Sequence, residues 1–119
     1  MAKAAEYGLG PQTFPRGWFI VAEKSELDAG PMAVTFFGRD FALYRGESGR
    51  PVMLDAYCAH MGTHLTAGHS AMIVRNGKQI EGDSIRCPYH AWRYGPDGHV
   101  DDIPYHEGPC PKSASIRSY

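Results

Sequence analysis

Short runs of aliphatic, aromatic and β-branched residues recur along the chain, and glycine, proline and aspartate separate them. Runs of this length and composition predict β-strands joined by tight turns. The best helical run, residues 25–29, is only one turn long. The pattern therefore predicts an all-β fold. We expect strands at 17–22, 33–37, 41–45, 51–57, 83–86, 92–94 and 99–100, and the start of another at 115–119.

Turn signals connect several of these runs into hairpins. Gly38, Arg39 and Asp40 separate two β-forming runs, and residues 95–98 separate another two. Asn76-Gly77 lies between β-formers in residues 72–80 and is the strongest short hairpin signal in the chain. The sheets are therefore expected to be antiparallel.

Composition and charge narrow the possible classes of protein. The chain has 119 residues, of which 43% are hydrophobic and 21% charged, so it suits one folded domain. We expect a flexible leader at 1–13 and a single domain at 14–119. The formal net charge of −1 indicates neither a nucleic acid nor an anionic membrane as partner. The first seven residues lack the apolar core of a signal peptide, and no run approaches the roughly 20 apolar residues that span a bilayer. A cytoplasmic protein is expected.

Two short segments carry the chemistry. Each combines one cysteine with one histidine directly after a predicted strand: Cys58 with His60, and Cys87 with His90. Two thiolates and two neutral imidazoles suit a [2Fe–2S] cluster, because imidazole ligands on one iron raise the reduction potential to roughly −150 to +300 mV. Histidines at the edge of such a cluster can also contact an electron partner or release a proton.

A structural zinc ion is the alternative for these four residues, and it would make the chain a zinc-stapled interaction module. Zinc fingers usually place two cysteines together and two histidines together. Here each arm mixes the two ligand types, and one residue separates Cys58 from His60. The arrangement therefore favours the iron–sulfur cluster.

The pattern Cys-x-His followed by Cys-x-x-His strongly resembles the Rieske family. The resemblance implies antiparallel sheets with a small cluster-binding subdomain, about 57–96, made by two loops. It also implies that Cys58 and Cys87 hold one iron of the [2Fe–2S] cluster and that His60 and His90 hold the other. The 26-residue spacer between His60 and Cys87 is longer than most members carry, and an inserted ribbon around Asn76-Gly77 accounts for the excess.

Finer features place the resemblance within the low-potential members of the family. Thr63 and Tyr89 stand where respiratory members carry an extra disulfide-forming pair of cysteines. Residues 108–111, Gly-Pro-Cys-Pro, resemble the family's loop over the cluster. The segments at 14–18 and 90–94 resemble ring-hydroxylating oxygenases, and Cys58-Ala-His-Met-Gly62 is similar to steroid-type terminal oxygenases.

This resemblance implies an electron-transfer role. A reductase or ferredoxin would supply single electrons, and the acceptor would be a mononuclear iron in an oxygenase catalytic domain that hydroxylates an aromatic or steroid-like substrate. The full-length form would be a trimer. Oxygenase subunits continue well past this length, so we expect an excised domain, a truncated product or a short relative. By itself the chain would transfer electrons without a catalytic iron site. The alternative is a stand-alone Rieske-type ferredoxin.

The remaining candidates carry weaker expectations. His64 and His69 superficially resemble an iron-binding pair but lack the carboxylate at position 61, so they are expected to face solvent. Cys110 is expected to be a spare thiol. Tyr89 and Trp92 are expected to pack below the cluster, and His99 and His106 to lie on the surface. Asp55, Asp101 and Asp102 are expected to be ordinary exposed carboxylates, with contact to a basic redox partner as the alternative.

Overall fold

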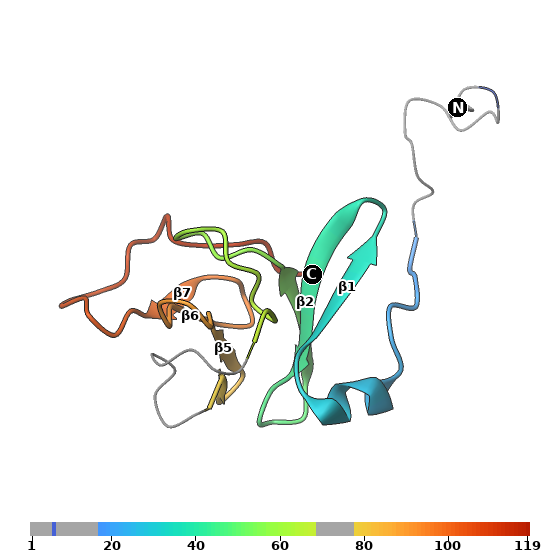
Figure 1. Cartoon of the computed structure of the whole chain (residues 1–119), viewed down its shortest axis with the longest axis horizontal. Helices are drawn as coiled ribbons and strands as arrows, with labels where there is room; N and C mark the ends of the chain where they lie inside the picture. Colours follow the sequence, from blue (N-terminus) through green and yellow to red (C-terminus); the bar gives the residue numbers. More distant parts are fainter. Residues whose placement is uncertain (1–5, 7–16, 69–77) are drawn as a thin grey trace.

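A computed structural model describes residues 6, 17–68 and 78–119, and it contains two small antiparallel sheets that lie beside each other (Figure 1). The expected all-β fold with antiparallel sheets is confirmed. The first sheet has the order β1-β2-β3, and the second has the order β4-β5-β6-β7. The first comprises β1 (Met32–Phe36), β2 (Arg39–Arg45) and β3 (Pro51–Asp55). The second comprises β4 (Ile80–Glu81), β5 (Ser84–Arg86), β6 (Arg93–Tyr94) and β7 (Val100–Asp102).

The β1–β2 hairpin confirms two predicted strands but places the turn earlier than expected. Phe36 pairs with Arg39, so Phe37 and Gly38 form a two-residue turn. Both have positive φ, 51° and 73°. Positive φ at both central residues matches the twist of the flanking strands, and this geometry favours two-residue hairpin loops. The expected turn at 38–40 was therefore wrong by one to two residues.

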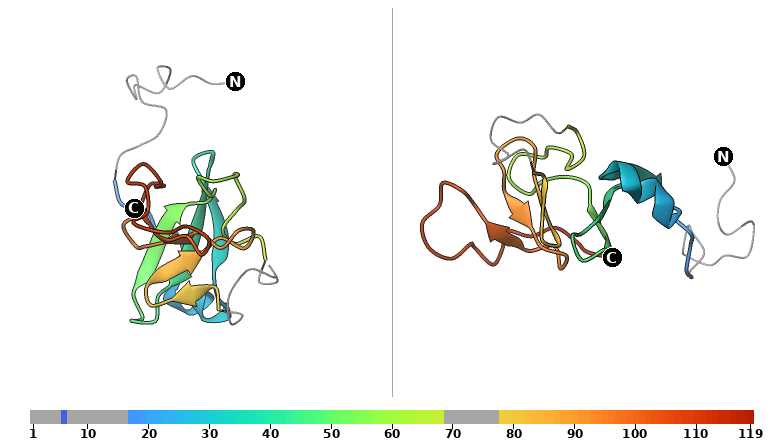
Figure 2. Two further views of the ribbon diagram at one scale, coloured as in Figure 1. Left: turned by 90° about the vertical axis from the view of Figure 1, so that its left-hand side faces the viewer. Right: turned by 90° about the horizontal axis from the view of Figure 1, so that it is seen from below.

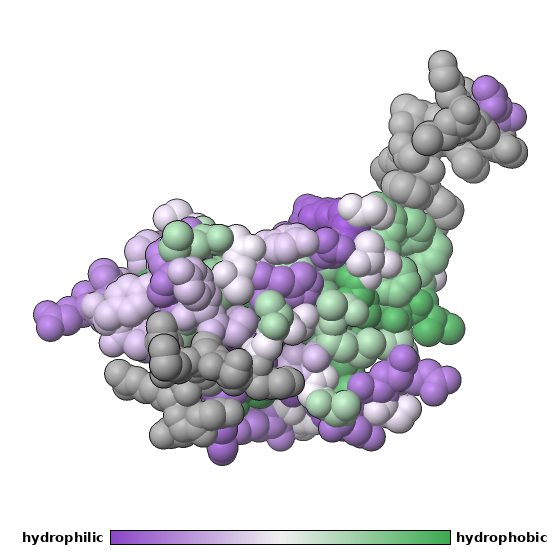
Figure 3. Space-filling model, in the orientation of Figure 1, coloured by the Kyte–Doolittle hydropathy of each residue, from purple (hydrophilic) through white to green (hydrophobic). Residues whose placement is uncertain are grey.

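The strand predicted at 17–22 is wrong. These residues form no strand. In the described part of the chain β1 pairs only with β2, so no further strand lies along its other edge. Trp18 and Ile20 are almost fully exposed, and Phe19 packs edge-to-face on Phe37 with ring centroids 5.0 Å apart. Figure 3 shows hydrophobic surface on the right-hand side of the molecule, the side on which β1 lies in Figure 1. The short 3-10 helix η2 (Lys24–Ala29) follows and buries one residue, Leu27.

The strand predicted at 115–119 is also wrong, because the C-terminal residues form only isolated bridges. Ser115 pairs with His99 of the second sheet, and Ser118 pairs with Leu54 of the first. The segment therefore crosses from one sheet to the other, as Figures 1 and 2 show. The predicted Asn76-Gly77 hairpin lies outside the described residues.

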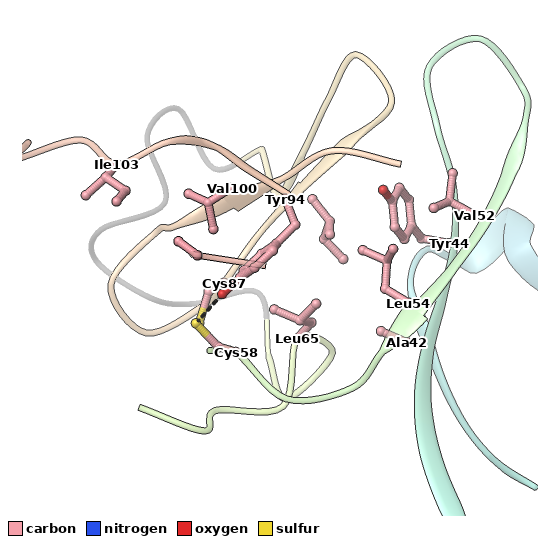
Figure 4. Close-up of a cluster of buried hydrophobic side chains, with 12 residues drawn as sticks. Ala42, Tyr44, Val52, Leu54, Cys58, Leu65, Cys87, Tyr94, Val100 and Ile103 are labelled. Carbon is pink, nitrogen blue, oxygen red and sulfur yellow. Dashed lines mark hydrogen bonds between the residues drawn. The ribbon is translucent and has the colours of Figure 1, made fainter. Parts of the chain in front are cut away.

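The main hydrophobic core lies between the two sheets. Tyr44 and Leu54 enter it from the first sheet and Tyr94 enters it from the second (Figure 4). Ile85 of the second sheet belongs to the same core, and all four side chains are fully buried. The Tyr44 hydroxyl also donates a 2.7 Å hydrogen bond to the carbonyl of Asp83. This core fixes the sheets relative to each other and places the two loops that each carry one cysteine and one histidine at one end.

Candidate metal centre

The first cysteine–histidine loop follows β3 and is closed by its own backbone. The amide of Cys58 donates to the carbonyl of Thr63 at 2.8 Å, and the amide of Gly62 donates to the carbonyl of Cys58 at 2.9 Å. Gly62 has φ 76°, a left-handed conformation that glycine adopts without steric cost. The chain turns back sharply after the cysteine as a result, and His60 lies at the exposed tip of the loop.

The second loop follows β5 and repeats the same hydrogen-bond pattern. The amide of Cys87 donates to the carbonyl of Trp92 at 2.8 Å, and the amide of Ala91 donates to the carbonyl of Cys87 at 3.0 Å. Ala91 has φ 61°, so an alanine occupies the left-handed position that Gly62 occupies in the first loop. The two loops thus present a cysteine and a histidine with closely related backbone geometry.

The two cysteine sulfurs meet in the interior. Cys58 and Cys87 are 4% and 2% exposed, and their side chains lie next to each other (Figure 4). The Cys87 thiol stabilises the Cys58 thiolate and lowers the pKa of Cys58 to about 5, and the same interaction raises the pKa of Cys87. Two neighbouring thiolates repel each other, and a bound metal cation would stabilise both.

Hydrogen-bond donors surround these sulfurs. Backbone amides of His60 and Met61 point to the Cys58 sulfur, and those of Tyr89 and His90 point to the Cys87 sulfur. Donors of this kind stabilise negative charge on sulfur and tune the potential of iron–sulfur sites.

The phenol of Tyr94 adds a side-chain donor. Its oxygen accepts a 2.9 Å hydrogen bond from the amide of Ala59, which leaves the phenol hydrogen available for the Cys58 sulfur at 3.1 Å. Burial and the hydrogen bond to Cys58 raise the pKa of Tyr94, so the phenol stays protonated and remains a donor.

The two imidazoles meet on the outer side of the loops. The rings of His60 and His90 have centroids 4.9 Å apart and an interplanar angle of 72°. Trp92 stacks on His60 at 4.5 Å and 12°, and the Trp92 indole donates a 2.5 Å hydrogen bond to the Tyr105 hydroxyl. Tyr89 contacts the other ring, at 3.7 Å. Trp92 and Tyr89 therefore pack on the imidazoles and limit how the rings can turn.

An ionic network supports the second loop from behind. The side chain of Arg86 is 5% exposed, and its guanidinium binds both carboxylate oxygens of Glu81 at 2.9 Å. The same guanidinium donates at 2.8 Å to the carbonyl of Ala91 and to the carboxylate of Asp102. The Arg86 guanidinium thus holds the carbonyl of Ala91, the residue with the left-handed backbone. Nothing in the sequence pattern around Cys87 pointed to this role of Arg86.

The other sequence candidates lie elsewhere or have other partners. His64 is half-buried, and its Nδ1 is 3.1 Å from the amide of Thr66, so the expectation that it faces solvent holds only in part. Its proposed partner His69 lies outside the described residues. Cys110 is a half-buried free thiol. His99 and His106 are exposed, as expected.

The acidic residues that were candidates for a partner contact form intramolecular ion pairs. Asp55 pairs with Arg39 at 3.2 Å. Asp101 pairs with Arg93 at 2.5 Å, and Asp102 with Arg86 at 2.8 Å. Their charges are therefore at least partly neutralised within the domain.

The donor set suits a group with two metal ions. Within residues 17–68 and 78–119, no three histidine, cysteine, aspartate or glutamate side chains converge as needed to hold one metal ion. The four candidate ligands instead form two pairs, one of sulfurs and one of imidazoles. A zinc ion needs four donors around a single point, whereas a [2Fe–2S] cluster with mixed ligands needs one pair for each iron.

A model of the Rieske [2Fe-2S] domain matches residues 17–119. The chain therefore belongs to the Rieske [2Fe–2S] domain family, and its cofactor is a [2Fe–2S] cluster. The role of such a domain is electron transfer. None of the helical turns in the described residues has the length and apolar character of a bilayer-spanning helix.

Individual relatives are oxygenase components and desaturases. The chain is 40% identical over 110 residues to a cholesterol 7-desaturase of Ciona intestinalis, covering 92% of this chain and 21% of that protein. It is 38% identical over 108 residues to the oxygenase component of 3-ketosteroid-9-alpha-monooxygenase from Rhodococcus rhodochrous, covering 88% and 26%. Dicamba monooxygenase bound to non-heme iron and dicamba has a similar structure, with a TM-score of 0.69 and 29% identity over 86% of this chain and 28% of that one. The chain thus spans about a quarter of the length of each of these three proteins.

Proposed function

We propose that Cys58 and Cys87 hold the inner iron of the cluster and that His60 and His90 hold the outer iron. The observation that carries this assignment is the pairing of the four side chains, with sulfurs paired in the interior and imidazoles paired on the outer side. The bound cluster supplies one-electron redox chemistry.

The residues of the chain have distinct parts in this function. Backbone amides and the Tyr94 hydroxyl stabilise the charge on the sulfurs. Trp92 and Tyr89 orient the imidazoles, and the exposed position of His60 brings the outer side of the site to the surface, where a partner can approach. The hydrophobic core closes the inner side to water.

We further propose that the domain, residues 14–119 after a leader at 1–13, serves a Rieske non-heme iron oxygenase. It would pass single electrons from a reductase or ferredoxin to a mononuclear iron that hydroxylates a steroid-like or aromatic substrate. The similarity to ketosteroid and cholesterol enzymes over most of this chain supports the steroid-like class. A cytoplasmic location and a trimeric full-length form belong to the same proposal. The alternative is a stand-alone Rieske-type ferredoxin.

Replacing His60 by cysteine tests the ligand assignment. An anionic thiolate in place of a neutral imidazole should lower the reduction potential by on the order of 100 mV, towards that of clusters with four cysteines. Protein-film voltammetry or redox titration gives the value. His106→Cys is the matched control, because it changes another exposed histidine. An unchanged potential in His60→Cys would show that His60 is not a ligand.

The wider role is tested with the isolated chain, a reductase, NAD(P)H, oxygen and a 3-ketosteroid. The cluster should be reduced and reoxidised while no hydroxylated steroid forms, because a separate catalytic iron site is required. Hydroxylated steroid formed by this chain alone would contradict the proposal that it only transfers electrons and that a separate domain holds the catalytic iron. When a separate oxygenase catalytic domain is added to this assay, hydroxylated steroid should form. If the chain delivers electrons only to an unrelated acceptor protein, the ferredoxin alternative is favoured.

A further inference from the structure

Gln79 lies outside both ligand loops, yet its side chain bridges them. It is 8% exposed and is one of few buried polar residues in the described part of the chain. Its Nε2 donates at 2.5 Å to the carbonyl of Leu65, just after the first loop, and at 3.1 Å to the carbonyl of Arg86, just before Cys87. One carboxamide therefore joins the end of one loop to the start of the other.

Both ends of this bridge are firmly held. The amide of Leu65 donates at 2.7 Å to the carbonyl of Ala56, two residues before Cys58, and Leu65 is fully buried. The amide of Arg86 donates at 2.8 Å to the carbonyl of Gln79 itself. A continuous set of hydrogen bonds thus runs from Ala56, just after β3, to Arg86, the residue before Cys87.

The bridge matters because it joins the loops through their backbones, whereas the other contacts between the loops described above are between side chains, such as His60 with His90 and with Trp92. Each loop is closed by hydrogen bonds within itself, and these fix its internal shape but not the distance to the other loop. A carboxamide with two donor hydrogens can satisfy two carbonyls at once, whereas an apolar side chain of the same length leaves both carbonyls buried without this donor.

We propose that Gln79 is a positioning residue that sets the spacing between the two ligand loops, and thereby the geometry of the cluster that they hold. This proposal rests on the ligand assignment made above. Gln79 touches no candidate ligand, so it acts through the backbone of Leu65 and Arg86.

The test compares Gln79→Met with Tyr44→Phe in the cluster-loaded domain. Methionine keeps the length of the side chain and removes the donor. Tyr44→Phe likewise removes one buried donor to a backbone carbonyl, but that hydrogen bond goes to Asp83, which lies in neither loop. Both variants should therefore lose stability, Gln79→Met by more because it removes two hydrogen bonds and Tyr44→Phe one, while only Gln79→Met disturbs the loops. Global stability is followed by urea unfolding.

Three readouts separate positioning from general stability: the reduction potential, the EPR spectrum of the reduced protein, and the rate at which a chelator bleaches the cluster. In Gln79→Met the EPR spectrum and the potential should shift, and bleaching should be roughly 5- to 30-fold faster than in the wild type. In Tyr44→Phe the potential and the spectrum should match those of the wild type.

Equal effects of the two variants, or no shift of potential and spectrum in Gln79→Met, would overturn the positioning role. Failure of the ligand assignment has a different result: the wild-type chain itself would then lack the spectrum of a [2Fe–2S] cluster with mixed ligands. The two failures are therefore distinguishable.

Discussion

Individual side chains around the sulfurs combine several tasks, and Tyr94 is the clearest case. Its phenol accepts from the amide of Ala59 and donates to the sulfur of Cys58, so it fixes the first loop and stabilises thiolate charge at once. A reduced cluster carries one more negative charge than an oxidised one, so a donor to sulfur stabilises the reduced state more.

Tyr94→Phe should therefore lower the reduction potential. A hydrogen bond that is about 1 kcal/mol stronger in the reduced state than in the oxidised state corresponds to roughly 40 mV for a one-electron couple. Redox titration checks the shift, and Tyr44→Phe, which removes a buried phenol in the other sheet, is the control. A potential equal to that of the wild type would mean that the Tyr94 hydroxyl does not act on the cluster.

At this scale the sequence points to the four candidate ligands and gives no sign of the residues that support their loops. Cys58, His60, Cys87 and His90 stand in two short motifs, so their chemistry is visible without a structure. Gln79 and Arg86 belong to no motif, and their roles arise from backbone carbonyls that only the folded chain brings to them. A buried polar side chain is the signal for such residues, and burial of one side chain cannot be read from a local sequence.

Among the structural elements, the turns impose the sharpest steric limits. Gly98 has φ 83°, and a Cβ there would come within 2.0 Å of the carbonyl oxygen of Ile116 in the C-terminal segment. Gly38 in the β1–β2 turn has a similar φ of 73°, but a Cβ there would meet nothing within 4 Å. Both glycines therefore need a positive φ, but only Gly98 lies so close to another segment that a side chain would clash.

Gly98→Ala should be far more destabilising than Gly38→Ala. The left-handed conformation alone costs about 1 kcal/mol for alanine, and the clash with Ile116 adds roughly 1–3 kcal/mol more. Urea unfolding of the two variants gives the difference in the free energy of unfolding. Equal values would mean that the C-terminal segment does not pack on the turn at Gly98.

The network behind the second loop predicts a pH dependence. The hydrogen bonds from Arg86 lower the pKa of Glu81 to about 2, with a further contribution from Arg93. A carboxyl whose pKa is lower in the folded state stabilises the fold above its unfolded pKa, near 4.5. That contribution is lost as the pH falls from about 5 towards 2.

Glu81→Gln should remove this contribution. At pH 7 the variant should be less stable by about 2 kcal/mol, and its stability should change less than that of the wild type between pH 5 and pH 2. Denaturant unfolding followed by circular dichroism checks both effects, and Glu107→Gln on the exposed loop is the control. Parallel pH curves for Glu81→Gln and the wild type would contradict the assigned role of the ion pair.

The elements also show where sequence patterns succeed and where they fail. Alternating and continuous apolar runs correctly predicted β2 and most of β1 and β3, because these strands bury side chains in the two hydrophobic clusters of the first sheet. Residues 17–22 have the same composition but lack a neighbouring strand in the described part of the chain. Strand propensity requires a pairing partner, and a single run of residues does not reveal one.

The whole molecule is organised around one end of the core. The two sheets contribute one loop each, and the sulfurs of Cys58 and Cys87 belong to the same buried cluster as Tyr44 and Leu54 (Figure 4). The all-β class followed from composition and turn signals alone. The way in which the sheets pack together did not, because contacts such as the one between Tyr44 and Asp83 join residues 39 positions apart.

The direct test of the account is metal and sulfide analysis of the anaerobically purified chain, together with EPR after reduction by dithionite. We predict about two iron and two acid-labile sulfide per chain, and an EPR signal typical of a [2Fe–2S] cluster with two cysteine and two histidine ligands. One zinc per chain, no sulfide and no EPR signal would contradict it.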